Sequence, residues 1–543
     1  MPKQLRFLLI VLVVVLAGLL AAGCGGGKDG KDAGKQAAEQ YIRYNLGAEP
    51  ETLDPARSTG LPEGTLITHL LEGLTRYDAN NVPQPAIAES WDISPDQLTY
   101  TFHLRDAKWS NGEPVTAEDF KYAWLRALNP ETAADYAYQL FYIKGAAEYN
   151  SGEGKAEDVA IKVVDPKTLE VTLKAPAPQF LGLTAFPTLF PINAKMDKEN
   201  PEWYKSPETY ICNGPFKMVS WEHNQKITTV KNENYWDAAN VKLQKLDFLL
   251  VESYDTAYNM YRTGEVDILV EDIPTQEIPQ LKASGELKIF PDCALYFYRF
   301  NVEKKPLNDV RVRKALAMAI DRQAIVENVT QAGQKPAFGF VPYGIADADG
   351  KDFQENSGNA FFKEDVAEAK KLLAEAGFPE GKGFPKLKLL YNTNEAHQKI
   401  AQAIQQMWKQ NLGIDIELVN QEWQVYLDSM DHQNFDICRS GWSPDYLDPM
   451  TFIDMFVTEP PENNNDTNWS NKKYDELVKK ANATGDQKER MAAMHEAEKI
   501  LMDEMPIMPI YYYTKPCLIK DNIKGVIIPP FAVYADFKYA YVE

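Results

Sequence analysis

Apolar and polar residues alternate along several short stretches in the first third of the chain. Residues 98–104 place Leu, Tyr, Phe and Leu at every second position, with polar residues between them. This period of two predicts a strand with one buried face. Residues 159–163 and 169–173 alternate in the same way on either side of Asp165-Pro166-Lys167, which predicts an antiparallel hairpin.

Apolar residues recur at helical spacing in the second half of the chain. Residues 366–376 predict a helix that ends at Gly377, and residues 396–412 predict a longer helix that ends at Gly413. The apolar stripe of the longer helix consists of Ile400, Ile404, Met407, Trp408 and Leu412.

The flanks of the longer helix predict its role in a sheet. The runs 387–391 and 414–419 are typical of strands, and together with the helix between them they predict a βαβ unit. Two further amphipathic helices are expected at 474–483 and 488–505.

A candidate binding site follows the next strand. Phe435–Gly441 predicts a strand, and the loop after it carries Trp442 and Asp445 before a turn at Asp448-Pro449. In α/β folds, ligands usually bind at loops beyond the carboxyl ends of strands. An aromatic ring beside a carboxylate suits the cationic end of a ligand. The alternative is that Asp445 only shapes its own turn, as Asp often does.

Size and charge restrict the class of protein. The chain has 543 residues, which is enough for several domains and a large core. Its formal net charge of −21 argues against nucleic acid as a partner, and against attachment to anionic lipid by charge. The chain is rich in Tyr (28) and Trp (10); these residues suit a binding cleft, although most of them must pack in the core.

The chain lacks the common catalytic and metal-binding motifs. Ser443 is not part of a GxSxG motif, because Asp445 stands where the second glycine would be. His495-Glu496 lacks the second histidine of HExxH. The six histidines are scattered along the chain. We therefore expect a protein that is not an enzyme and that has no cofactor and no metal site.

The cysteines do not define a framework. They show neither a CxxC pair nor a zinc spacing, and they are Cys24, Cys212, Cys293, Cys438 and Cys517. Cys293 and Cys438 are candidates for a disulfide in an oxidising compartment.

The N-terminus has the features of an exported lipoprotein. Lys3 and Arg6 precede an apolar run at 7–22, as in a secretory signal peptide. Leu20-Ala21-Ala22-Gly23-Cys24 resembles a bacterial lipobox, with Ala21 at the position of the usual leucine. We expect residues 1–23 to be a signal peptide, Cys24 to carry the lipid anchor, and the Gly-rich residues 24–39 to form a flexible tether. The alternatives are an uncleaved anchor and a different cleavage site.

Seven phrases that occur in a fixed order reveal a family resemblance. They are EPETLDP at 49–55, LEGLT at 71–75, AIAESWDISPDQLTYTFHLRDAKWSNGEPVTAEDF at 86–120, NGPF at 213–216, NYW at 234–236, GEVD at 264–267 and NDVRVR at 308–313. Together they resemble the large extracytoplasmic solute-binding proteins of peptide ABC importers, and within that family the oligopeptide-binding proteins. The resemblance spans about residues 41–541.

This resemblance implies a mixed α/β (α+β) fold of the periplasmic-binding-protein type, with two lobes, three domains and a hinge. Lobe I would combine residues 40–71, 196–293 and 513–543, with a small domain inserted at 72–195. Lobe II would be residues 294–512. The implied function is to capture oligopeptides outside the cytoplasmic membrane and to deliver them to the permease subunits of an ABC transporter. The protein would act as a monomer, held at the membrane by its lipid.

The resemblance also implies roles for individual residues. Asp445 would meet the N-terminal ammonium of the peptide, and His397 would approach its C-terminus. Gly441 and Ser443 would pair with the peptide main chain. The remaining implied ligand-binding residues are Trp442 and Arg439 in the same segment, Tyr136 and Trp423 as aromatic lining, and Thr59, Gly60 and Leu61 as backbone contacts.

The chain also departs from the family pattern. Thr59 stands where enterobacterial relatives have a glutamate, and Met430 and Thr330 stand near positions where they use Arg and Lys toward the peptide carboxylate. Ala294 and Ser443 replace the two cysteines that those relatives bridge. The preferred peptide length and the disulfide therefore do not carry over.

Two alternative functions use the same scaffold. The protein could bind a different ligand, such as a dipeptide, a murein or signalling peptide, a nickel chelate, haem or a sugar. It could also be a peptide sensor or chaperone that serves no transporter.

Overall fold

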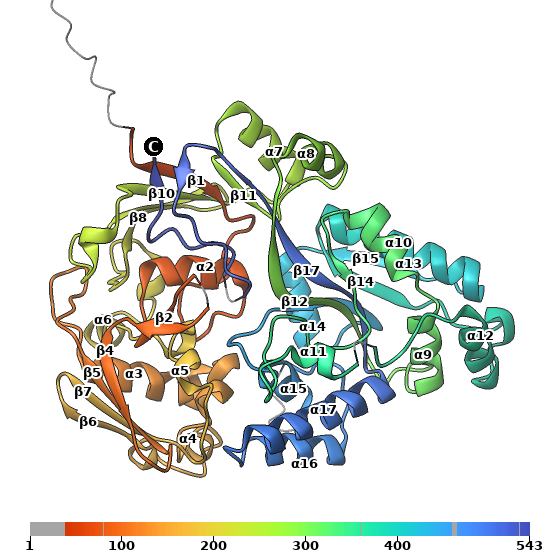
Figure 1. The fold of residues 1–543 in the computed structure, drawn as a ribbon, viewed down its shortest axis with the longest axis horizontal. Coiled ribbons are helices and arrows are strands. Elements are labelled where there is room, and N and C mark those ends of the chain that lie inside the picture. The colour runs from red at the N-terminus through yellow and green to blue at the C-terminus, as the bar shows by residue number, and fades with distance from the viewer. Residues whose placement is uncertain (1–37, 80, 359, 459–463, 532) are drawn as a thin grey trace, which may run out of the picture. The chain divides into compact units, whose positions relative to one another are not determined.

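A mixed sheet of 11 strands organises the described part of the chain, which is residues 38–543 without 80, 359, 459–463 and 532. The strands of its main path are, in spatial order, β15 (Glu417–Gln421), β14 (Lys388–Asn392), β16 (Ile437–Trp442), β12 (Lys288–Phe300), β17 (Ile507–Ile519), β11 (Ile268–Val270), β1 (Tyr41–Asn45), β10 (Lys245–Leu249), β9 (Lys226–Lys231) and β8 (Phe216–Glu222). β13 (Lys335–Pro336) pairs with β17 off this path. Figure 1 shows this computed structural model.

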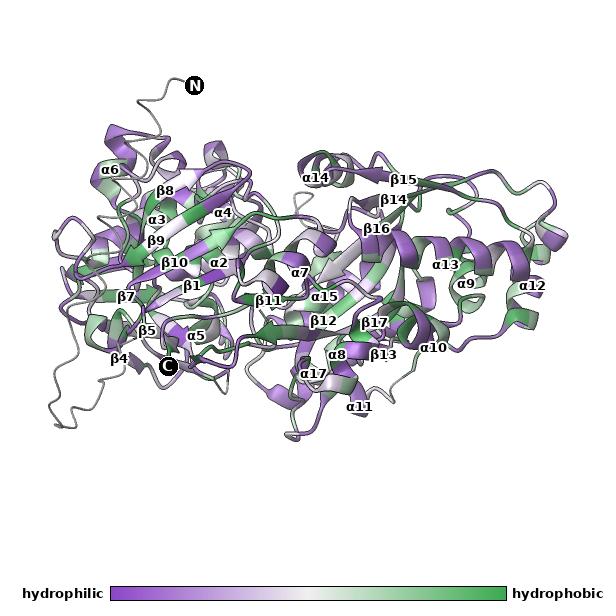
Figure 2. Ribbon diagram, turned by 90° about the horizontal axis from the view of Figure 1, so that it is seen from above, coloured by the Kyte–Doolittle hydropathy of each residue, from purple (hydrophilic) through white to green (hydrophobic). Residues whose placement is uncertain are grey.

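Two long strands, β12 and β17, lie in the middle of this sheet. They join β15, β14 and β16 on one side to β11, β1, β10, β9 and β8 on the other. Each has 13 residues, and they run antiparallel to one another. Most residues of both strands are buried, and Figure 2 shows mixed hydrophobic and hydrophilic colouring along them. The sequence did not predict β17, because Pro509 and Pro516 interrupt it and proline usually indicates an edge strand or no strand. Pro509 pairs with Phe297 directly after a register shift, where the regular ladder is already broken.

The strands predicted in the first third of the chain form a separate four-stranded sheet. Its order is β4 (Ala88–Ile93), β5 (Thr99–Leu104), β7 (Thr168–Thr172) and β6 (Ile161–Asp165). β5 buries every second residue, which confirms the predicted strand, and β6 pairs antiparallel with β7, which confirms the predicted hairpin.

The predicted helices are present with small shifts at their ends. They are α12 (Val366–Glu375), α13 (Glu395–Leu412), α16 (Lys472–Ala481) and α17 (Gln487–Glu504). Gly413 ends α13 at φ +71°, a left-handed conformation that glycine adopts without strain. The apolar stripe of α13 is buried except Met407, which is half-buried.

The predicted βαβ unit is confirmed in its pairing. β14 and β15 lie parallel on either side of α13 in the sequence, and Leu389 pairs with Leu418. β15 begins at Glu417, whereas the sequence predicted Ile414 as its first residue. β14 also pairs parallel with β16, so the loop after β16 leaves the sheet at a carboxyl edge.

The remaining elements connect and cover these sheets. The helices are α2 (Leu61–Leu70), α3 (Ala117–Leu128), α4 (Ala146–Asn150), α5 (Phe180–Leu183), α6 (Ala194–Glu199), α7 (Tyr254–Thr263), α8 (Ile278–Ser284), α9 (Val310–Met318), α10 (Arg322–Ile325), α11 (Phe353–Asn356), α14 (Trp423–Asp431) and α15 (Met450–Ile453). The short strands are β2 (Thr75–Tyr77), β3 (Pro83–Pro85), β18 (Ile523–Lys524) and β19 (Tyr541–Val542).

The candidate disulfide between Cys293 and Cys438 is not formed. Both cysteines are buried and free, as are Cys212 and Cys517. Cys438 on β16 pairs with Arg299 on β12, and Cys293 lies six residues farther along β12. At about 3.3 Å per strand residue this separates the two cysteines by about 20 Å. A disulfide needs Cα atoms within about 7 Å.

Several predictions are not tested by this fold. The predicted signal peptide, Cys24 and residues 25–37 of the tether lie outside the described residues. Residues Gln40–Glu543 form one compact unit, so the proposed lobe boundaries stay predictions. No helix among the described residues is long and apolar enough to span a membrane. Within the same residues, no group of three or more His, Cys, Asp or Glu side chains is arranged to hold a metal ion.

Candidate ligand-binding site

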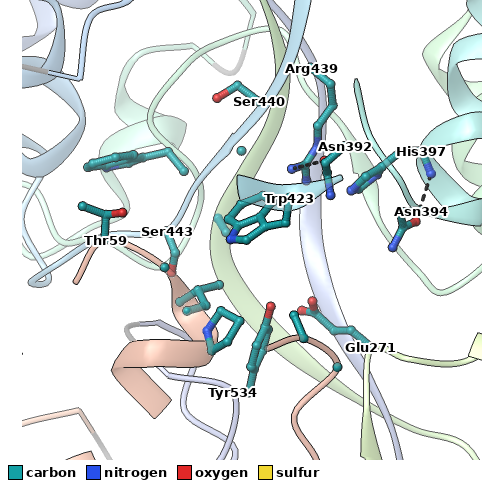
Figure 3. Close-up of a pocket in the computed structure, with 18 of the residues that line it drawn as sticks. Thr59, Glu271, Asn392, Asn394, His397, Trp423, Arg439, Ser440, Ser443 and Tyr534 are labelled. Atoms are coloured by element: carbon teal, nitrogen blue, oxygen red, sulfur yellow. Dashed lines mark hydrogen bonds between the residues drawn. The ribbon is translucent and has the colours of Figure 1, made fainter. Parts of the chain in front are cut away.

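A cavity of about 830 Å³ is lined by every ligand-binding residue that the sequence predicted. These residues are Thr59, Gly60, Leu61, Tyr136, His397, Trp423, Arg439, Gly441, Trp442, Ser443 and Asp445. Figure 3 shows part of this cavity, with Thr59 and Ser443 on one side and His397 and Arg439 on the other. The tertiary structure therefore brings together segments that are far apart in the sequence.

Asp445 is a buried carboxylate in the cavity wall, with only 4% of its surface exposed. Gln139 donates a hydrogen bond from Nε2 to Asp445 Oδ2 at 2.7 Å, and Thr451 Oγ1 donates to the same oxygen at 3.4 Å. Burial raises the pKa of Asp445 to about 8, and hydrogen bonds from Thr451, Tyr136 and Gln139 only partly offset that rise. Within the described residues Asp445 forms no ion pair. The carboxylate is thus held in place but lacks a counter-charge.

The loop that carries Asp445 is fixed from two sides. Trp442 Nε1 donates to Thr451 O at 2.8 Å, and the Asp445 backbone N–H donates to Thr451 Oγ1 at 3.1 Å. Arg490 from α17 forms two hydrogen bonds of 2.6 Å with the carboxylate of Asp448. Such a bidentate pair restricts orientation as well as distance. Asp445 is therefore placed by more than its own turn.

Arg439 occupies another part of the cavity wall. Its Nη2 donates to Tyr513 Oη at 2.6 Å, and its guanidinium lies 4.8 Å from the centre of the Tyr296 ring. Its Nε has no hydrogen-bond partner among the described residues. A Cβ at Gly441 would lie 3.4 Å from Arg439 Nη2 and 3.3 Å from Tyr513 Oη. A side chain there would press on this arrangement.

His397 and Trp423 stand at the starts of two helices. Asn394 accepts hydrogen bonds from the backbone N–H groups of Ala396 and His397, and so caps α13. His397 Nδ1 is buried without a partner among the described residues, and burial lowers the pKa of His397 well below its usual value. Trp423 is the first residue of α14 and stacks on Tyr426 at 5.7 Å between ring centres.

The Thr59–Leu61 segment enters α2 at its N-terminus. Gly60 is the N-cap residue, and a Cβ there would come within 2.0 Å of Glu63 Oε2. Glu63 is 1% exposed and accepts a hydrogen bond from the backbone N–H of Glu51 at 2.7 Å. A side chain at position 60 would therefore require the Glu63 carboxylate, which packs under this part of the cavity wall, to move.

The two family departures near the proposed carboxylate end also line the cavity. Thr330 and Met430 are both part of its wall. Thr330 Oγ1 donates to Gln334 Oε1 at 2.9 Å. Neither residue brings a positive charge.

Sequence reasoning missed several residues of the site. Glu271, Asp272 and Asp292 line the cavity as acidic groups. Glu271 and Asp272 directly follow the short strand β11, which was a readable signal. Gln139 had no such signal, because its contact with Asp445 crosses 306 positions.

Comparison with known proteins identifies the fold. Residues 82–464 match the family model described as bacterial extracellular solute-binding proteins, family 5 Middle. The oligopeptide-binding protein OppA of Bacillus subtilis (strain 168) is 44% identical over 497 residues, which cover 90% of this chain and 90% of that protein. The crystal structure of Haemophilus influenzae OppA in complex with RPPGFSPFR has a TM-score of 0.86 at 34% identity, and the alignment covers 94% of this chain and 100% of that one. The predicted periplasmic-binding-protein-like fold is therefore confirmed.

A second structural comparison concerns conformation. The unliganded open form of the murein tripeptide-binding protein MppA is 37% identical to this chain, and the alignment covers 93% of this chain and 98% of that one. Its TM-score is only 0.64. The described structure is thus more similar to the peptide complex than to this open form.

Proposed function

Because the chain belongs to family 5 of the bacterial extracellular solute-binding proteins, we propose that it captures oligopeptides outside the cytoplasmic membrane and delivers them to an ABC transporter. One observation carries the choice of ligand: Asp445 is buried in the wall of a large cavity without an ion pair among the described residues. The relatives support this choice, since one is named an oligopeptide-binding protein and another holds a nonapeptide.

The α-ammonium group of a peptide supplies the charge that Asp445 lacks. A buried carboxylate is costly unless it is paired or protonated. Burial holds the pKa of Asp445 at about 8, so the empty site keeps a proton near neutral pH. An incoming ammonium favours the ionised form, and the pair then forms a charge-assisted hydrogen bond. This fixes the N-terminus of every peptide at the same place.

Main-chain pairing supplies affinity that does not depend on sequence. Gly441 and Ser443 lie at the end of β16, and Ser443 is beyond the last residue pair between β12 and β16. An extended peptide can add to the main chain here, and Thr59–Leu61, which also line the cavity, can contribute further backbone contacts. Trp442, Tyr136 and Trp423 then line the space for side chains.

The far end of the peptide would meet Arg439 and His397. Arg439 keeps an unpaired Nε, and His397 keeps an unpaired ring nitrogen. Both are suited to a carboxylate, the arginine through charge and the histidine as a hydrogen-bond donor. We assign the peptide C-terminus to this part of the cavity.

Delivery requires the transporter to distinguish the loaded protein from the empty one. We propose lobe I as 40–71, 196–293 and 513–543, the inserted domain as 72–195 and lobe II as 294–512, with closure on the peptide. A ligand shifts such an equilibrium only by binding one state better. The lower similarity to an unliganded open relative supports a closed arrangement here. Cys24 would tether the monomeric protein to the membrane through its lipid.

Two measurements test this function. Native mass spectrometry of the purified protein should show co-purified peptides, which would also report their length. Isothermal titration calorimetry should then show binding of tetra-alanine and a loss of affinity of at least 100-fold for N-acetyl-tetra-alanine, which lacks the ammonium. Equal affinity for the two peptides would exclude Asp445 as the N-terminal anchor, and no binding of either would refute an oligopeptide ligand.

A further inference from the structure

The wall of the cavity is strongly acidic. Among the described residues that line it, eleven are Asp or Glu, three are Arg and none is Lys. One of the three arginines, Arg299, is already paired with Asp466 and also donates to Asn464 O. A cleft lined by charges of one sign concentrates their field. The excess is far larger than one N-terminal ammonium requires.

Three of these acidic residues are shielded from solvent and lie close together at one corner of the cavity. Glu271 and Asp272 follow β11, and Asp292 lies on β12. Burial raises the pKa of Asp272 to about 7. Burial, together with the neighbouring Asp292, raises the pKa of Glu271, and burial also raises that of Asp292. These carboxyl groups therefore lack enough compensating charge.

The nearest cation, Lys515, forms an ion pair with Asp292 and supplies one charge beside these three carboxyl groups. Lys515 Nζ lies 3.8 Å from Asp292 Oδ1 and donates its hydrogen bonds to the backbone oxygens of Pro529 at 2.7 Å and Val533 at 3.0 Å. Asp292 is 5% exposed in its side chain, and its Oδ1 accepts no hydrogen bond from the described residues. A buried acceptor without a donor costs free energy. It would gain a partner from a cationic ligand.

Glu271 is the member of the corner that is open to the cavity. Its carboxylate makes no hydrogen bond or ion pair within the described residues, whereas Asp272 accepts from Asn45 at 2.7 Å. Figure 3 shows the Glu271 carboxylate and the Tyr534 hydroxyl both pointing into the cavity. The Glu271 backbone adopts φ +66°, and its N–H donates to Pro516 O at 2.8 Å. The residue therefore has an uncommon backbone conformation, and its side chain points into the cavity.

We propose that this corner receives the cationic side chain of a lysine or arginine residue of the bound peptide, with Glu271 as its direct partner and Asp292 behind it. The inference rests on the proposed oligopeptide function and deepens it, because it selects peptides that carry a basic residue. Asp445 would bind the N-terminal ammonium that all peptides share, and Glu271 would bind a basic side chain that only some peptides have.

Matched peptides test this selectivity. Four tetra-alanine peptides each carry one lysine at position 1, 2, 3 or 4, and four partners carry norleucine, which has the same carbon chain without the ammonium. Calorimetry in 0.5 M salt suppresses the contribution of exposed charges. At one position the lysine peptide should bind at least tenfold more tightly than its norleucine partner. Glu271→Gln should remove that preference and leave the norleucine affinity within about twofold.

Two further variants complete the experiment. Glu252→Gln removes an exposed carboxylate from the same cavity wall and should keep the preference. Asp292→Asn should reduce the preference, and it stands in for Glu271→Gln if that variant does not fold. A preference that survives in both Glu271→Gln and Asp292→Asn, or no preference at any position while tetra-alanine binds, would overturn the inference alone. Failure of every peptide to bind would overturn the proposed function as well.

Discussion

The two acidic residues to which we assign ligand contacts, Asp445 and Glu271, differ in the contacts that hold their side chains. Asp445 is held by Gln139 and Thr451, and its loop is clamped by the Asp448–Arg490 pair. Glu271 has no side-chain partner among the described residues and is held only through its backbone. A fixed acid suits a ligand group that is always in the same place. An unsupported acid tolerates side chains of different length, as lysine and arginine have.

The largest expected effect comes from removing the negative charge of Asp445. Asp445→Asn keeps the shape of the side chain but removes its charge. Breaking a buried charge pair typically costs about 3–5 kcal/mol, which is on the order of 10²–10³-fold in affinity or more. Calorimetry with tetra-alanine should show this loss. Asp428→Asn, in an exposed carboxylate of the same cavity wall, should bind within about twofold of the wild type; an equal loss there would argue for a general charge effect.

The Asp448–Arg490 ion pair, which holds the loop of Asp445, should stabilise the folded protein. Arg490 is 1% exposed, and Arg490→Met leaves the Asp448 carboxylate buried without its partner. We expect a loss of about 3–5 kcal/mol in the free energy of unfolding, measured by urea titration. The double variant with Asp448→Asn should recover part of that loss. A stability unchanged by Arg490→Met would mean that the clamp contributes nothing.

Loss of the hydrogen bond that Gln139 donates to Asp445 should have a smaller effect on peptide affinity. Gln139 is fully buried, and Gln139→Leu removes its hydrogen bond to Asp445. A hydrogen bond to a charged group is worth about 1.5–3 kcal/mol, so tetra-alanine should bind roughly 10- to 100-fold more weakly. The lysine preference assigned to Glu271 should remain. If the lysine preference were lost, the binding contributions of Asp445 and Glu271 would not be independent.

A separate expected effect concerns pH and the empty protein. The folded pKa of Asp445, about 8, lies above its usual unfolded value of about 3.9. The folded state therefore binds the proton more tightly, so this group favours folding at low pH, and the contribution is lost as pH rises toward 8. Peptide-free Asp445→Asn should gain stability over the wild type, and the gain should be larger at pH 8 than at pH 5. Melting curves at both pH values measure it, and a constant difference would contradict the raised pKa.

Local patterns in the sequence determined the parts of the molecule that depend on near neighbours. The apolar stripe of α13 with Gly413 at its end, the alternation in β5, and the strand that leads to Asp445 were all readable, because each follows from the periodicity of one element. The family resemblance added residues such as Thr59 and Tyr136, which have no local signal of binding.

Tertiary structure alone decided which distant groups meet. It paired β12 with β17 across the two proline positions of β17, separated Cys293 from Cys438 along antiparallel strands, and brought Gln139 to Asp445. It also gathered Glu271 and Asp292 beside Lys515, which pairs with Asp292 and also donates to Pro529 O. Burial and the distance between charges set the pKa of these groups, and both quantities arise only when remote segments pack together.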